Sequence, residues 1–296
     1  MDLFLQHLAD GLSLGFAYAL IGLGFSLVFG TLKFLNFAHS GLLMLSAFVG
    51  WAIADEGHGN FFLVLAVSMC VGAVLATVLE RALIRPVVGR SFTAPFITTL
   101  GASLIMLAVA KSVWNTEPKA FSVPFAEGSL DIGPVRVTAI QWLINGVTVV
   151  VMLLLAYLIQ RTRLGLMVRA AAENTDMAKA MGVNTGRIAS LTMAISGALA
   201  GISGTLLAAS LGAVSVFAGD IYGLKGMVAM IVGGIGSLRG AVIAGVAIGL
   251  GEVMVSAYIS STWRDFFAFG LLIAVLLWRP AGLFGSREDR FVPVAV

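Results

Sequence analysis

The sequence predicts an all-α integral membrane protein with eight or nine hydrophobic helical segments. Its composition is 59% apolar and only 11% charged, whereas a soluble domain carries roughly 25% charged residues. Several stretches of about 20 residues contain no charge, and this is the length that a helix needs to cross a bilayer. The apolar runs are continuous rather than alternating with polar residues, which favours helices over a closed barrel.

Nine apolar runs lie between charged, glycine or proline breaks. They cover residues 10–30, 38–54, 61–79, 93–113, 138–160, 188–210, 223–236, 240–258 and 265–279. The runs 38–54 and 223–236 are shorter than the roughly 20 residues of a full span. Two alternatives stay open for both of them: a short crossing, or a broken or re-entrant segment.

The distribution of basic residues predicts the orientation. If every run crosses, one side holds Arg81, Arg85 and Arg90, then Arg161, Arg163, Arg169, Lys179 and Arg187, and lastly Arg279, Arg287 and Arg290. The positive-inside rule makes this side cytoplasmic. The other side receives Asp55, Glu56, the connection 114–137 and the region around Asp220. The N-terminus is therefore expected outside and the C-terminus inside.

Glycines inside the apolar runs predict close helix packing. Three pairs have GxxxG spacing, namely Gly11 and Gly15, Gly197 and Gly201, and Gly245 and Gly249. This spacing removes side chains from one helical face, so a neighbouring backbone can approach closely. The single cysteine, Cys70, lies in another apolar run, which excludes a disulfide within the chain.

The long polar loop 161–187 is expected to contain two short helices. Its small and apolar residues recur at helical spacing, at Met167, Ala170, Ala171, Ala178 and Met181. Thr175 or Asn174 can cap the second helix, and Gly182 stands where helices often end in a left-handed residue. Two alternatives stay open for this second helix. Its small alanines can enter a groove on a soluble partner, or it can lie on the lipid headgroups.

Polar residues near membrane depth are the candidates for a solute path. Asn36 and His39 must cap a helix, face a cavity or meet another chain, because lipid offers them no hydrogen bonds. Capping is the preferred interpretation for these two. Glu252 lies inside a hydrophobic run, where an acid is a functional candidate that is also explained by protonation or by pairing with another helix. Gly233 and Gly234 interrupt a short apolar run, which suggests a discontinuous element beside a path.

An enzyme is not expected. The sequence GISG around Ser203 matches a short motif of intramembrane serine proteases, but a serine nucleophile needs a nearby general base. The three histidines, His7, His39 and His58, precede this helix in the chain, and none lies in a later helix. No metal site, nucleotide site or other cofactor is expected in this chain, and its small net charge of +3 gives no support for nucleic-acid binding.

Several blocks, taken in order, resemble the permeases of branched-chain amino acid ABC transporters, especially the Liv-type subunit. They are GLSLGFAYALIGLGFSLVFG, LNFAH, ERALIRPVVGRS with APFITTLGASL, TRLGLMVRAAAENTDMAKAMGVNT, GGIGSLRGAVIAG and RDFFAFGLLIAVLLWRPAGLFG. The resemblance covers nearly the whole chain. It implies one permease domain over residues 1–296, with a coupling loop at about 161–187 and a periplasmic loop at about 114–137.

The resemblance also implies a role and a set of partners. The chain would form half of an importer's path for branched-chain or other hydrophobic amino acids in a bacterial inner membrane. Its partners would be a second permease, two cytoplasmic ATP-binding subunits and a periplasmic solute-binding protein, and those ATP-binding subunits would use the ATP. The alternatives are a permease for urea or short amides within the same family, and a stand-alone secondary transporter.

Particular residues follow from the resemblance and from the polar positions above. The stretch from Arg169 to Arg187 looks like the coupling helix that docks on the ATPase, which assigns this role to Arg169, Ala171, Glu173, Asp176, Ala178, Lys179, Gly182 and Arg187. The candidates for the translocation path are Asn36, His39, Gly233, Gly234 and Glu252.

Overall fold

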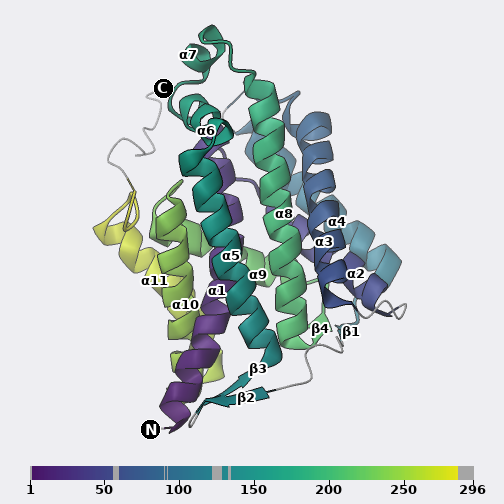
Figure 1. Cartoon of the computed structure of the whole chain (residues 1–296), viewed down its shortest axis with the longest axis vertical. Coiled ribbons are helices and arrows are strands. Elements are labelled where there is room, and N and C mark those ends of the chain that lie inside the picture. The colour runs from purple at the N-terminus through teal and green to yellow at the C-terminus, as the bar shows by residue number, and fades with distance from the viewer. Residues whose placement is uncertain are drawn as a thin grey trace.

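The computed structural model describes residues 2–55, 60–89, 91, 93–121, 129–132 and 135–285. Long helices run roughly along one axis and form a bundle (Figure 1). Within the described residues, eight helices are long and apolar enough to cross a membrane. They are α1 (Asp2–Leu32), α2 (Ala38–Asp55), α3 (Phe61–Leu79), α4 (Ala94–Trp114), α5 (Ala139–Arg161), α8 (Thr185–Leu211), α10 (Leu238–Tyr258) and α11 (Arg264–Trp278). The spans of α3 and α11 include a neighbouring helical turn each, so they cover Phe61–Ile84 and Ser261–Trp278. The prediction of an all-α membrane protein is thereby confirmed.

The other elements are short. A π-helical turn, η1 (Glu80–Ile84), continues α3, and a 3₁₀ turn, η3 (Ser261–Trp263), precedes α11. Helices α6 (Arg163–Glu173) and α7 (Thr175–Ala180) lie beyond one end of the bundle, which we call the α6–α7 end (Figure 1). Helix α9 (Ala218–Gly233) has 16 residues and is not among the eight spans. Of the two short predicted runs, only the first therefore forms a helix of spanning length.

The opposite end holds the N-terminus and four short strands, and we call it the strand end (Figure 1). Strand β1 (Lys119–Ala120) pairs antiparallel with β4 (Ala213–Val214), and β2 (Ser129–Ile132) pairs antiparallel with β3 (Val135–Thr138). The Trp51 indole nitrogen of α2 donates to the Ala120 carbonyl at 3.0 Å. This contact places the C-terminal end of α2 at the strand end.

Glycines join the central helices, as their spacing predicts. A Cβ atom on Gly15 of α1 would overlap the Val246 backbone of α10, and a Cβ atom on Gly249 would overlap Gly15. On α8, a Cβ atom on Gly197 would overlap the Gly72 carbonyl of α3 in the same way. These backbones are in direct contact because no side chain separates them.

The outer helices expose apolar side chains, as expected for a surface that meets lipid or another membrane chain. Examples that are at least 60% exposed come from α4, α5 and α11 and include Ile97, Leu153, Leu154, Ile273 and Leu277. Cys70 of α3 is also exposed. The basic residues of the predicted inner loops follow α3, α5, α7 and α11. Glu56, His58, Arg90, Arg287 and Arg290 lie outside the described residues.

Candidate functional site

The α6–α7 end is built by local signals that the sequence carries. The Thr162 hydroxyl accepts the Gly165 N–H at 3.1 Å and caps α6. The Asn174 side chain accepts the N–H groups of Asp176 and Met177 at 3.0 and 2.9 Å and caps α7. Gly182 follows with a φ of +83°, a left-handed conformation that favours glycine. The predicted pair of short helices and the Gly182 terminus are confirmed, and of the two predicted cap residues, Thr175 and Asn174, it is Asn174 that caps α7.

The alanines of these helices face the chain itself. Ala171 and Ala178 are buried in a small cluster with Val168 and Ile188. Their methyl groups hold α6 and α7 against the first turns of α8 because small side chains allow close approach. The expectation that the alanine face is the one presented to a groove on another protein is wrong for this conformation.

The outward face of α7 is formed by other residues. Met177 is 66% exposed and Met181 is 84% exposed. The predicted coupling residues Glu173, Asp176, Lys179, Gly182 and Arg187 are exposed. Lys179 pairs with Asp176 at 3.2 Å, and the Arg169 guanidinium donates to the Ile159 carbonyl. Unbranched methionines adapt to many partner shapes, so this face is suited to contact another protein.

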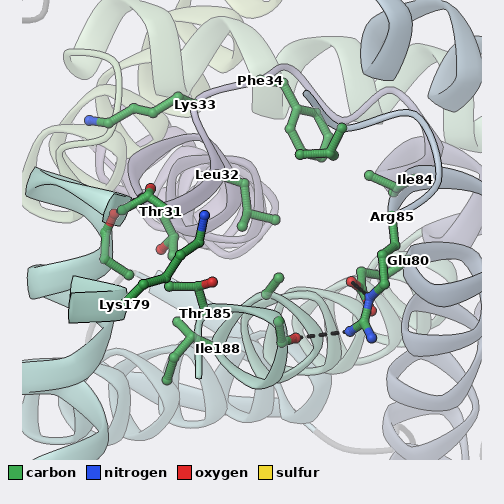
Figure 2. Close-up of a pocket in the computed structure, with 15 residues that line it drawn as sticks. Thr31, Leu32, Lys33, Phe34, Glu80, Ile84, Arg85, Lys179, Thr185 and Ile188 are labelled. Carbon is green, nitrogen blue, oxygen red and sulfur yellow. Dashed lines mark hydrogen bonds and ion pairs between the residues drawn. The ribbon is translucent and has the colours of Figure 1, made fainter. Parts of the chain in front are cut away.

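A pocket of about 410 Å³ lies between the end of α1, η1, α7 and the start of α8. Figure 2 shows Lys179 reaching toward its centre from α7, while Glu80 and Arg85 lie together on the opposite wall. Apolar side chains such as Leu32, Phe34, Ile84 and Ile188 complete the lining. The pocket therefore separates α7 from the end of α1 and from η1.

Asn36 and His39 do not cap α2, contrary to the preferred expectation. Residues 33–37 form a non-helical segment after α1, and the Asn36 side chain points to the Met193 sulfur at 3.7 Å. His39 is fully buried, with its Nδ1 atom 3.1 Å from the Ser196 hydroxyl. Its ring packs against Phe25, with 4.6 Å between the ring centroids. Both side chains are held inside the bundle by α1 and α8 rather than at a helix end.

This junction of α1, α2 and α8 contains unsatisfied polar atoms. Within the described part of the chain, Asn36 Oδ1, His39 Nε2 and Thr192 Oγ1 are buried without a hydrogen-bond partner. Each such group is costly in a low-dielectric interior. Irregular backbone at membrane depth is tolerated where it is buried in protein or lines a cavity. Asn36 and His39 therefore remain candidates for the path.

Glu252 is paired, which was one of the three explanations open for it. Its side chain is fully buried and receives the Lys225 ammonium at 2.8 Å, the Arg264 guanidinium at 2.8 Å and the Tyr18 hydroxyl at 2.8 Å. Lys225 also contacts Asp265 at 2.9 Å. Two basic and two acidic side chains thus balance one another, with Lys225 and Glu252 buried and Asp265 exposed. Lys225, Arg264 and Tyr18 were not among the predicted site residues.

Gly233 and Gly234 lie where α9 ends, and the segment after α11 packs against them. Gly234 has a φ of +114°. The N–H groups of Leu283 and Phe284 donate to the Val232 and Gly233 carbonyls at 2.9 Å each. The interruption that the sequence predicts is present, and the C-terminal segment satisfies carbonyl groups that the helix end leaves free. Their role as path residues stays a prediction.

Ser203 is buried in α8, and its hydroxyl donates to the Ala200 carbonyl at 3.2 Å. This is the common hydrogen bond of a serine to the preceding helical turn. The Ser203 side chain therefore contributes to helix packing in this structure.

Comparison with known proteins places this arrangement among transport proteins. Residues 7–276 match the family model described as the permease component of branched-chain amino acid transport systems. The high-affinity branched-chain amino acid transport system permease protein LivH of Escherichia coli (strain K12) is 33% identical, covering 96% of this chain and 96% of LivH. BraD of Pseudomonas aeruginosa is also 33% identical, over 96% of this chain and 97% of BraD. A probable branched-chain amino acid transport permease protein LivH of Methanocaldococcus jannaschii is 28% identical, covering 90% of this chain and 88% of that protein.

Proposed function

Because this chain belongs to the family of branched-chain amino acid transport permeases, it is a membrane-spanning permease subunit, and we propose that it forms half of an ATP-driven importer's translocation path. The cargo is a branched-chain or other hydrophobic amino acid. The chain itself performs no chemistry. ATP binding and hydrolysis occur in two separate cytoplasmic subunits that move it between two conformations.

The observation that carries the proposal is the outward face of α7. ATP-binding subunits that move a membrane protein must bind a rigid element of it outside the lipid. Helix α7 is capped by Asn174, anchored to the bundle through Ala178, and offers Met177 and Met181 to a partner. Arg169, Glu173, Asp176, Lys179, Gly182 and Arg187 surround this contact, and Ala171 and Ala178 position it.

The basic loops support an orientation for the proposed importer. With the α6–α7 end in the cytoplasm, the arginines after α3 and α5 obey the positive-inside rule. The N-terminus and the strands are then periplasmic, where a solute-binding protein delivers the cargo. A second permease packs on part of the exposed apolar surface. The membrane is the inner membrane of a bacterium, and residues 1–296 act as one permease domain.

Two alternatives lead to different measurements. A permease for urea or short amides would keep the same partners and differ in cargo. A secondary transporter would work alone, driven by an ion gradient, and is expected to place broken helices or buried acids in both halves of the chain. Glu252 is paired with Lys225 and Arg264, which favours a structural role for this acid.

Reconstitution tests the proposal. The chain is purified with the proposed second permease, ATP-binding subunits and solute-binding protein, and the complex is placed in liposomes. We expect uptake of labelled leucine only with ATP, and competition by isoleucine and valine but not by urea. Leucine uptake by the chain alone, driven by an ion gradient, would remove the ABC permease assignment.

A further inference from the structure

A π-helical turn at the end of α3 brings two charged residues onto one side of the chain. Residues five apart in an α-helix lie about 140° apart around the axis, so Glu80 and Arg85 would point in different directions. In η1 the Arg85 N–H donates to the Glu80 carbonyl at 2.7 Å, which is the wider π spacing. This widened turn rotates Arg85 back over Glu80.

The Glu80 carboxylate is buried and fully engaged. Its side chain is 3% exposed. Arg85 Nε lies 3.0 Å from Oε1, and Arg85 Nη2 lies 3.2 Å from Oε2. The Ser190 hydroxyl donates to Oε2 at 2.7 Å. A buried carboxylate with this bidentate partner is held in one position, because losing a partner would leave an uncompensated charge.

The same arginine grips the first two turns of α8. Arg85 Nη2 donates to the Gly186 carbonyl at 2.9 Å and to the Ser190 hydroxyl at 2.9 Å, and the contact with Gly186 is the one that Figure 2 marks with a dashed line from Arg85. Gly186 and Ser190 are one helical turn apart, so they present one face to Arg85. Helix α8 begins at Thr185, directly after α7 and Gly182. The cluster therefore joins α3 to the point where α7 enters the bundle.

Below this cluster, α3 and α8 stay in backbone contact. The Gly72 and Gly197 backbones touch, and Gly201 lies against the Ser68 carbonyl. Packed interfaces of this kind move as rigid bodies rather than deforming continuously. The contacts of Arg85 at the α6–α7 end can therefore couple the motion of α3 to that of α8.

We propose that Glu80, Arg85 and Ser190 form a latch that makes α3 follow α8 when the partner ATPase moves α7. The three residues are positioning residues for transport and do not touch the cargo. The latch rests on the proposed function, since it transmits a motion that separate ATP-binding subunits supply. Its location on the wall of the pocket next to α7 leaves room on the other side for α7 to shift.

The test uses the reconstituted complex and measures leucine imported per ATP hydrolysed. Arg85→Gln and Ser190→Ala remove contacts of the latch, while Arg81→Gln is the matched control. Arg81 lies in the same turn, is exposed, and makes no hydrogen bond or ion pair with the described residues. We expect the ratio to fall at least about tenfold in Arg85→Gln, because losing even one of the charge-assisted hydrogen bonds of Arg85 corresponds to about that factor. The control keeps the wild-type ratio.

Further variants separate transmission from plain stability. Arg85→Lys keeps the charge but not the fork, so we expect partial recovery. Adding Ser190→Ala to Arg85→Gln should cost little more, because both act on one contact network. A wild-type ratio in Arg85→Gln overturns the latch, as does a parallel loss of ATP hydrolysis, uptake and thermal stability. If the wild-type complex shows no ATP-driven uptake at all, the proposed function fails first, and the latch fails with it.

Discussion

The ammonium group of Lys225 lies 2.8 Å from Oε1 of Glu252, and the two side chains are 4% and 0% exposed. Arg264 and Asp265 extend this contact, so α9, α10 and the start of α11 meet at one balanced group of charges. Tyr18 joins it from α1. In a low-dielectric interior each charge depends on its neighbours, since an unpaired ion there is strongly disfavoured.

Replacing Glu252 is expected to destabilise the fold. Glu252→Gln leaves Arg264 without a carboxylate and Lys225 with only the exposed Asp265, and we predict a loss of about 3 kcal/mol. The thermal unfolding midpoint of the purified protein in detergent measures it. Asp265→Asn is the matched control and should cost less than about 1 kcal/mol, because Asp265 is 66% exposed. Equal losses in the two variants would argue against a structural role for the buried pair.

A methyl group between α3 and α8 should separate these helices. Gly72→Ala places a Cβ atom on the Gly197 carbonyl, and overpacking of this kind costs about 1–3 kcal/mol. Gly101→Ala in α4 is the control, since nothing lies within 4 Å of the added atom. The control should be neutral or slightly stabilising, as alanine favours helices over glycine. Similar midpoints for both variants would contradict the close approach.

The path candidates can be tested by their reactivity. The chain has one cysteine, Cys70, so Cys70→Ser gives a background for introducing Asn36→Cys or His39→Cys. Both positions are buried in this conformation. We expect a charged methanethiosulfonate to modify them during ATP turnover and not at rest. Cysteines at 36 and 39 that never react in an active complex would exclude both residues from the path.

Changes near α7 should separate ATP hydrolysis from uptake. A leucine at Gly182, where φ is +83°, strains the backbone by about 1–2 kcal/mol and adds bulk beside the outward face. We predict that Gly182→Leu lowers uptake, and that the charge reversal Lys179→Glu does the same while membrane insertion persists. Gly89→Leu is the control, because Gly89 has a φ of +88° in the turn after η1 and nothing lies within 4 Å of an added Cβ atom. Normal uptake in both α7 variants would tell against docking there.

Local signals in the sequence predicted the α6–α7 end well. The Asn174 cap and the left-handed Gly182 depend on neighbours within a few positions, and glycine spacing indicated the faces where α1 meets α10 and α8 meets α3. These features involve a single residue type at a fixed spacing. They can therefore be identified without knowing the tertiary arrangement.

Contacts between distant segments could not be predicted in this way. Glu80 and Ser190 are 110 positions apart, and Arg85 contacts both of them through a π turn that no sequence pattern predicts. Lys225 stood in a predicted apolar run, and only the packing of α9 against α10 makes it the partner of Glu252. Asn36 and His39 were expected to be caps. Their burial could not be predicted, because it depends on contacts with α8, which lies far along the chain. Glu252, an acid inside a hydrophobic run, was the one sequence signal that pointed to part of the Lys225–Glu252 charge group.

Photo-crosslinking from Met181 tests the central claim most directly. This residue is 84% exposed on the outward face of α7, so a photoreactive group there should attach the chain to an ATP-binding subunit. The same group at Tyr157, which is 65% exposed on α5, serves as the comparison and should not reach that subunit. A crosslink from Met181 to the ATP-binding subunit is the predicted result. Crosslinks from Met181 only to lipid or to this chain itself, in membranes that import leucine, would contradict it.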